Sequence, residues 1–135
     1  MICLDTNVVI AVLKQAPAPL LQRFLRALPE GGLALSSIVL FELHYGIANS
    51  ARREENAERL GIFLQAPIEV LALESEDAEE AGALRAELKR AGTPIGPYDL
   101  LIAAQARRRG ATLVTANRGE FARVPRLLTE DWTVA

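Results

Sequence analysis

Short apolar runs alternate along this chain with longer segments in which apolar residues recur at helical spacing. Four short runs predict buried strands, at residues 2–4, 33–35, 68–73 and 112–115. The remaining segments predict helices, at residues 7–14, 17–28, 37–49, 53–64, 76–91 and 99–109. Strands that alternate with helices in this way are typical of a parallel sheet with helices on both faces.

Small residues mark the ends of these elements. A glycine pair at residues 31–32 ends the second helix. A serine pair at residues 36–37 is a strong capping signal for the third helix. The C-terminal tail predicts a short helical turn and an edge strand near Trp132. Because no repeat, low-complexity tract or linker interrupts the pattern, we expect one domain over residues 1–135.

The composition limits the class of function. Half of the residues are apolar and 24% are charged, which is typical of a folded globular protein. The net charge of −2 argues against a generic nucleic-acid coat, which would be strongly basic. A local basic rim around a site is still compatible with this charge.

The single cysteine, Cys3, permits no internal disulfide and favours a reducing compartment. The N-terminus lacks a basic region followed by a long apolar run, so we expect no signal peptide. No apolar stretch approaches the length of a membrane span. We therefore expect a cytoplasmic protein that does not contact a membrane.

Asp5 is the first candidate for chemistry. It directly follows the first apolar strand and precedes a helix, so we expect it at the carboxyl end of a strand, where open parallel sheets bind ligands. Asp5, Thr6 and Asn7 are all good helix caps, although one cap would suffice. This redundancy and this location favour a functional Asp5 over a simple cap.

Glu42 is the second candidate. It lies among Val39, Leu40 and Leu43 in a strongly apolar helix, where a carboxylate is costly to desolvate unless a cation compensates it. Gly46 follows one turn later and leaves space for a ligand. Glu42 is thus either a metal ligand or the partner of an arginine.

Asp99 is the third candidate. It opens a helix that is apolar on every side at residues 99–104, which is typical of a buried helix. The loop at residues 94–97 contains two prolines and would fix the direction of the carboxylate. Asp99 is either a cap or a ligand.

A fourth group follows the strand at residues 112–115. Thr115, Asn117 and Glu120 offer a hydroxyl, an amide and a carboxylate there, although the first two could be ordinary turn residues. The sequence does not settle whether Asn117 or Glu120 faces the site. We favour Asn117, because it lies closer to the strand and should be held more rigidly.

Several kinds of site are excluded. His44 and Cys3 are the only residues of their types, so no zinc cluster can form, and we expect His44 to be structural or partly exposed. The chain has no nucleophile elbow and no glycine-rich phosphate loop. Converging carboxylates remain, and sites with only oxygen ligands suit Mg²⁺ or Mn²⁺, which activate water and stabilise charge on a phosphoryl group.

Four segments in order, at residues 4–7, 37–46, 94–104 and 113–132, resemble PIN-domain nucleases. Among these nucleases the chain is most similar to the VapC-type toxins of bacterial toxin–antitoxin pairs, close to the FitB-like branch. The resemblance covers nearly the whole chain. It implies an α/β fold, a three-layer α/β/α PIN-like domain with a central parallel sheet.

The resemblance also implies an endoribonuclease that depends on Mg²⁺, for which Mn²⁺ can substitute. Asp5, Glu42 and Asp99 match the family's carboxylate ligands of the metal. Many relatives carry an aspartate where this chain has Asn117, so this fourth catalytic position keeps an oxygen and loses a charge. Glu120 could compensate for that loss.

Three hydroxyl residues would support these ligands according to the resemblance: Thr6, Ser37 and Thr115. The family further implies an RNA substrate, a homodimer, and a cognate antitoxin that blocks the site with a peptide, often through an arginine. Assembly on DNA would then occur through the antitoxin. Apolar stripes at residues 20–25 and 60–64 could form the groove for that peptide, unless they belong to the core.

Two other readings compete with this one. A phosphatase of the haloacid-dehalogenase type needs a second aspartate at the position of Asn7 and a later catalytic lysine, for which only Lys89 is available. The second alternative is a PIN-fold protein that binds antitoxin or RNA but has lost catalysis through the change at Asn117. The three retained carboxylates argue against it.

Overall fold

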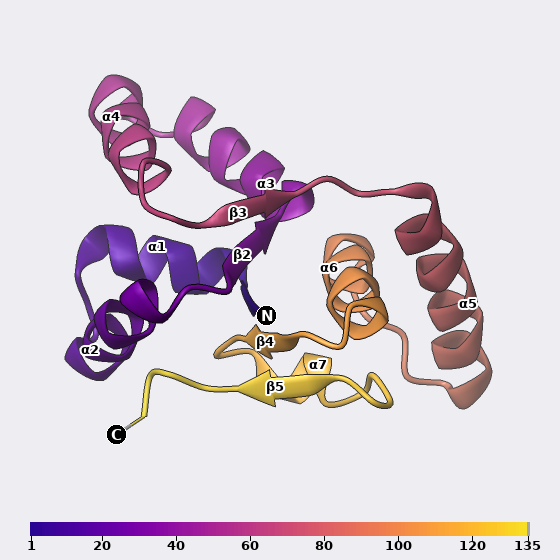
Figure 1. The fold of residues 1–135 in the computed structure, drawn as a ribbon. Coiled ribbons are helices and arrows are strands. Elements are labelled where there is room, and N and C mark those ends of the chain that lie inside the picture. Colours follow the sequence, from indigo (N-terminus) through magenta and orange to yellow (C-terminus); the bar gives the residue numbers. More distant parts are fainter. Residues whose placement is uncertain (135) are drawn as a thin grey trace.

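The computed structural model describes residues 1–134 and contains one five-stranded, fully parallel sheet flanked by helices (Figure 1). The strands are β1 (Ile2–Leu4), β2 (Leu33–Ser36), β3 (Glu69–Leu71), β4 (Thr112–Val114) and β5 (Leu128–Glu130). The helices are α1 (Thr6–Lys14), α2 (Ala18–Ala27), the 3-10 turn η1 (Leu28–Glu30), α3 (Ser37–Ala48), α4 (Arg53–Phe63), α5 (Ser75–Ala91), α6 (Pro97–Arg108) and α7 (Arg118–Phe121). The predicted three-layer α/β/α fold with a central parallel sheet is confirmed.

The order of the strands, β3-β2-β1-β4-β5, creates a crevice in the middle of the sheet. The chain moves outward from β1 to β3 and then crosses back to β4 and β5. Right-handed connections therefore place α1–α4 on one face and the later helices on the other, as Figure 1 shows for α5 and α6. The order reverses between β1 and β4, and ligands of open sheets bind at such a switch point.

The two apolar stripes considered for a groove lie mainly in the core. Leu20 and Phe24 of α2 are buried, as are Leu60 and Phe63 of α4. The rings of Phe24 and Phe63 stack at 5.9 Å and join the two helices. Leu25 is the exposed exception.

Most element boundaries differ from the predicted ones by one or two residues, and two of these differences bear on the site and the sheet edge. The helix predicted from residue 99 begins at Pro97, because proline has the backbone angle of a first helical residue and needs no amide partner there. Asp99 is thus the third residue of α6. The predicted edge strand near Trp132 lies slightly earlier, at Leu128–Glu130, and pairs with β4, while Trp132 itself is buried.

A buried polar network fixes α6 against α5. The side chain of Asp77 is fully buried, and it accepts hydrogen bonds from Arg108 Nε at 2.6 Å, from the Glu74 amide at 2.9 Å and from Gln105 Nε2 at 3.2 Å. Burial opposes the charge on Asp77, but these hydrogen bonds and Arg108 hold its pKa below the usual value. No pattern in the sequence singles out Asp77, whose role is to position the helix that carries Asp99.

Within residues 1–134, no single helix is both long enough and apolar enough to cross a membrane. One bent pair of helical segments, Thr6–Lys14 and Ala18–Glu30, has the length and apolar composition of a membrane span only when the two are taken together.

Candidate active site

Asp5 lies at the carboxyl end of β1, as predicted, and caps α1. Its side chain is buried, Oδ1 accepts a hydrogen bond from the Thr6 amide at 2.8 Å, and Oδ2 accepts one from the Thr115 hydroxyl at 2.8 Å. Burial raises the pKa of Asp5, although both hydrogen bonds counteract it. Asp5 thereby joins the ends of β1 and β4, the two strands that border the switch point.

Glu42 is a half-buried residue of α3 and contacts the same segment. The Thr6 hydroxyl donates a hydrogen bond of 2.7 Å to Glu42 Oε1. Thr6 therefore touches Asp5 through its amide and Glu42 through its hydroxyl. The partner in contact with Glu42 is this hydroxyl and not an arginine, which was the structural alternative.

Asp99 lies half-buried in the first turn of α6 and shares a hydrogen bond with Glu120. Burial raises the pKa of Asp99 to about 7, and the hydrogen bond and the negative charges of Glu120, Asp5 and Glu42 act in the same direction. The negative charges of Glu42 and Glu120 thus act on both Asp5 and Asp99, which brings carboxylates from the end of β1, from α3, from α6 and from α7 into one region.

Glu120 contacts Asp99 because it folds back onto the start of α6. Its Oε1 accepts a hydrogen bond of 2.7 Å from the amide of Gly96, the N-cap residue, and this bond lowers the pKa of Glu120. A carboxylate is favoured at such a helix N-terminus, where amide groups lack intrahelical partners.

Asn117 reaches the site through Glu120. Its side chain is exposed, and Nδ2 donates a hydrogen bond of 2.9 Å to Glu120 Oε2. The backbone amide of Asn117 donates a hydrogen bond to the Thr115 hydroxyl at 3.0 Å. From the sequence, Asn117 was the favoured residue for the position facing the site. In the structure the side chain in contact with Asp99 is Glu120.

The remaining candidates differ in their contacts. Thr6 and Thr115 each bond a carboxylate of the site. The Ser37 hydroxyl instead accepts a hydrogen bond of 3.2 Å from the Leu73 amide and fastens the segment after β3. His44 is exposed, as expected, and Cys3 is buried, which raises the pKa of its thiol to about 11.

The donor set suits a hard cation, although it is not a closed chelate. Within residues 1–134, no three His, Cys, Asp or Glu side chains stand close enough together to hold a metal ion as they are. The groups that approach the site are nevertheless oxygen donors with an excess of negative charge. Mg²⁺ retains several waters and is commonly held by one or two carboxylates together with substrate phosphates, so an open arrangement of this kind fits it.

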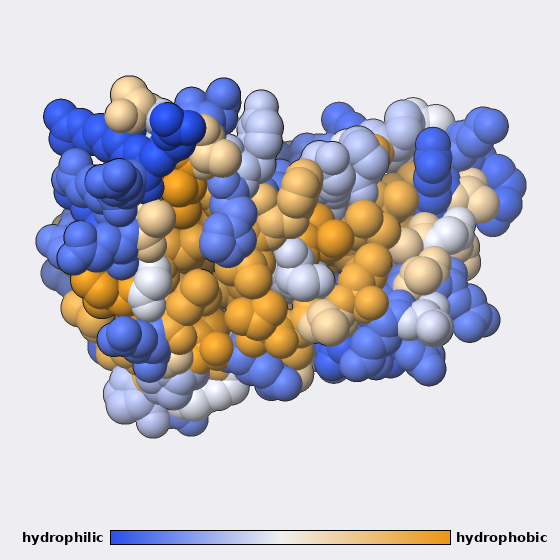
Figure 2. Space-filling model, turned by 90° about the horizontal axis from the view of Figure 1, so that it is seen from above, coloured by the Kyte–Doolittle hydropathy of each residue, from blue (hydrophilic) through white to orange (hydrophobic). Residues whose placement is uncertain are grey.

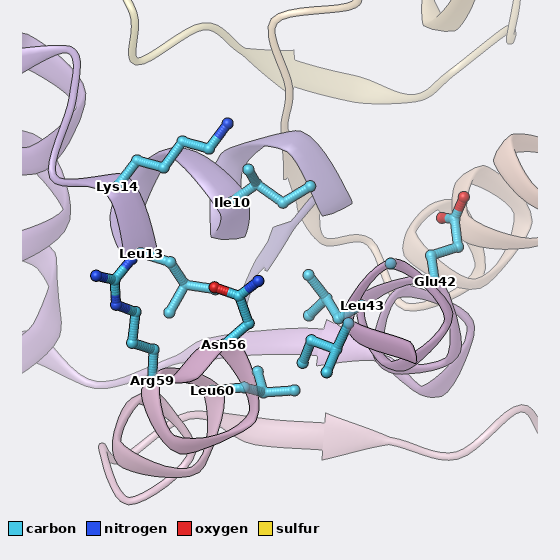
Figure 3. Close-up of a pocket in the computed structure, with 10 residues that line it drawn as sticks. Ile10, Leu13, Lys14, Glu42, Leu43, Asn56, Arg59 and Leu60 are labelled. Atoms are coloured by element: carbon cyan, nitrogen blue, oxygen red, sulfur yellow. The ribbon is translucent and has the colours of Figure 1, made fainter. Parts of the chain in front are cut away.

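A cavity of about 230 Å³ lies between α1, α3 and α4 and extends from Glu42. Figure 3 shows Glu42 at one end and Lys14 and Arg59 at the opposite end, with Leu13 and Leu43 along the walls. Gly46 also lines this cavity, and a side chain there would meet no atom within 4 Å. The space expected beside Gly46 is therefore present.

The chain is similar to known proteins in both sequence and fold. A model of the PIN domain matches residues 2–127. The tRNA(fMet)-specific endonuclease VapC of Shigella flexneri is 43% identical over 130 residues, which cover 96% of each chain.

Solved structures agree with that match. The structure of VapBC2 from Rickettsia felis bound to a DNA fragment from the promoter superposes with a TM-score of 0.90 at 38% identity, covering 98% of this chain and 99% of that one. DNA-bound VapBC from Salmonella typhimurium gives a TM-score of 0.89 at 40% identity and 97% coverage of both chains. This chain therefore belongs to the PIN-domain family, among its VapC-type members.

Proposed function

We propose that this protein is an endoribonuclease that depends on Mg²⁺ or Mn²⁺ and serves as the toxin of a toxin–antitoxin pair in the cytoplasm. The observation that carries the proposal is the set of carboxylates Asp5, Glu42, Asp99 and Glu120 beside the switch point of the sheet. Hydrogen bonds from Thr115, Thr6 and the Gly96 amide hold Asp5, Glu42 and Glu120 there. Its similarity to proteins named as VapC ribonucleases supports a nuclease.

Each residue of the site has a proposed role. Asp5, Glu42 and Asp99 would hold the cation, which supplies activated water and stabilises charge on the phosphoryl group when bound. Thr115 fixes the orientation of Asp5 through its hydrogen bond, and Thr6 keeps Glu42 beside Asp5. Glu120, which the Gly96 amide fixes at the start of α6, would hold Asp99 in place beside the cation.

The antitoxin would bind in the cavity beside Glu42. Its apolar walls, with Leu13 and Leu43, suit an apolar side chain, and Glu42 at the end suits an arginine of the same peptide. The similar VapBC structures from Rickettsia felis and Salmonella typhimurium are bound to DNA, which supports an assembly on DNA through the antitoxin. We also propose a homodimer, the state that the family implies.

Cleavage of RNA by purified, antitoxin-free protein tests the proposal. Because the Shigella flexneri relative is named for tRNA(fMet), that tRNA is the first substrate to try. We expect cleavage with Mg²⁺ or Mn²⁺ and none in excess EDTA. Glu42→Gln should abolish cleavage, whereas Glu58→Gln, which changes an exposed carboxylate of α4, should retain it.

The same assay addresses the alternative, a PIN-fold protein that binds antitoxin or RNA without cutting it. Equal cleavage in excess EDTA would refute the metal mechanism. Absence of cleavage with either metal, in a protein that still binds its antitoxin, would favour the alternative. In cells, expression should arrest growth, and co-expression of the neighbouring antitoxin gene should relieve the arrest.

A further inference from the structure

The aromatic residues divide sharply between the core and one part of the surface. The chain has four phenylalanines, two tyrosines and one tryptophan. Four of these residues are buried: Phe24, Phe63, Phe121 and Trp132. The other three, Phe41, Tyr45 and Tyr98, are 48%, 64% and 46% exposed. Packing of the core therefore does not account for them, and all three flank the candidate active site.

Phe41 and Tyr98 form a pair that bridges α3 and α6 beside the carboxylates. Phe41 directly precedes Glu42, and Tyr98 directly precedes Asp99. Their ring centroids lie 5.4 Å apart in an edge-to-face arrangement with an interplanar angle of 62°. Tyr45 follows Phe41 by one helical turn, so it lies on the same side of α3.

The face of the molecule on which α3 lies carries an apolar area (Figure 2). Figure 2 shows hydrophobic side chains gathered across the middle of the face on which α3 lies, with hydrophilic side chains at both ends. Scattered exposed apolar residues are ordinary in proteins, but a contiguous group beside a site indicates a ligand. Aromatic rings exposed in this way serve single-stranded nucleic acids as stacking partners for bases.

We propose that Phe41 and Tyr98 stack against an RNA base next to the scissile phosphate, and that Tyr45 extends this platform to a second base. The proposal rests on the proposed function for its substrate class. Continuity with the site supports it, because a phosphate held near Glu42 and Asp99 brings the attached nucleotides to the neighbouring rings. Every base has a face that can stack, but only unpaired bases expose it, so the platform selects unpaired RNA.

Binding of a fluorescent RNA tests the platform. The probe is a single-stranded oligonucleotide that the wild-type protein cuts, with 2-aminopurine on either side of the cut. The Asp5→Asn background prevents cleavage during the titration. We expect Tyr98→Ala and Phe41→Ala to weaken binding about tenfold each and to remove the quenching of 2-aminopurine that stacking causes. In cleavage, the same variants should raise KM more than they lower kcat.

Two further variants separate stacking from other effects. Tyr98→Phe keeps the ring and should bind the probe like the parent protein. Leu25→Ala removes a similarly exposed apolar side chain on α2, which is 55% exposed, and should change neither binding nor quenching. If Tyr98→Ala lowers the Tm, Phe41→Ala and Tyr45→Ala carry the test instead.

Three outcomes would overturn the inference. Unchanged affinity and quenching in the alanine variants, while the wild type cuts RNA, would remove the platform and leave the proposed function intact. A changed sedimentation coefficient in Tyr98→Ala would assign the rings to an interface between copies of the chain. Failure of the wild type to cut any RNA would remove the proposed function and the platform together.

Discussion

Replacing Asp99 by asparagine should stabilise the metal-free protein at alkaline pH. In the folded state the pKa of Asp99 rises from 3.8 to about 7, so the folded protein holds this proton more tightly than the unfolded chain does. The contribution of Asp99 to the free energy of unfolding is greatest below pH 3.8, the ordinary pKa, and is lost as the pH rises through about 7. Asparagine cannot ionise, so the variant should escape this loss.

The magnitude follows from the same rise. At about 1.4 kcal/mol per pKa unit, the rise in the pKa of Asp99 would correspond to roughly 4 kcal/mol in the free energy of unfolding. The carboxyl of Asp99 is half-buried, so solvent screening reduces this to about 1–2 kcal/mol. For a chain of this length that gain corresponds to a Tm increase of roughly 3–8 °C. Glu120 acts in a different pH range. Because the pKa of Glu120 is lowered, the stability that this group contributes is lost only as the pH falls below its ordinary pKa of 4.5.

Thermal unfolding in EDTA at pH 5 and pH 8 measures the effect. We expect the variant to melt higher than the wild type at both pH values. The difference should be larger at pH 8, because only part of the loss between pH 3.8 and about 7 has occurred at pH 5. Mg²⁺ should raise the Tm of the wild type at pH 8 more than that of the variant. A variant that melts lower than the wild type at pH 8 in EDTA would refute the reasoning and identify Asp99 as a structural cap.

Four further variants test the contacts around these carboxylates and the anchoring of α6. Glu120→Gln should raise the metal concentration for half-maximal cleavage, as a metal titration would measure. Asn117→Asp should lower the Tm in EDTA, because it places a charge 2.9 Å from Glu120. If Asn117→Asp instead lowers the metal requirement and Glu120→Gln leaves it unchanged, Asn117 is the residue that faces the site. Thr6→Val should lower kcat about tenfold by releasing Glu42, with an unchanged fold by circular dichroism, and undiminished kcat would show that this hydrogen bond does not matter. Asp77→Ala should cost roughly 3 kcal/mol in urea unfolding, because it leaves buried donors without an acceptor, and a loss below 1 kcal/mol would contradict that role.

The sequence by itself determined the kinds of elements and their order. Buried strands and amphipathic helices have different periods, and these periods depend on residues close together in the chain. The same local pattern placed Asp5 after a strand and Glu42 on an apolar helix, where a carboxylate stands out. Their roles as ligands remain predictions until a metal titration is made.

Only the tertiary structure decided which of these groups meet. Thr6 bonds Glu42 across 36 positions of the chain, and Thr115 bonds Asp5 across 110. Glu120 contacts Asp99 because the Gly96 amide attracts its carboxylate. No periodic pattern encodes such a contact.

The same reason explains the other differences between prediction and structure. An apolar stripe looks alike in sequence whether it meets another helix or solvent, so the meeting of Phe24 with Phe63 in the core emerged only from the fold. Phe41 and Tyr98 likewise became a pair only when α3 packed near α6. Local periodicity determines the elements, whereas the side-chain partners are set by packing between segments far apart in the chain.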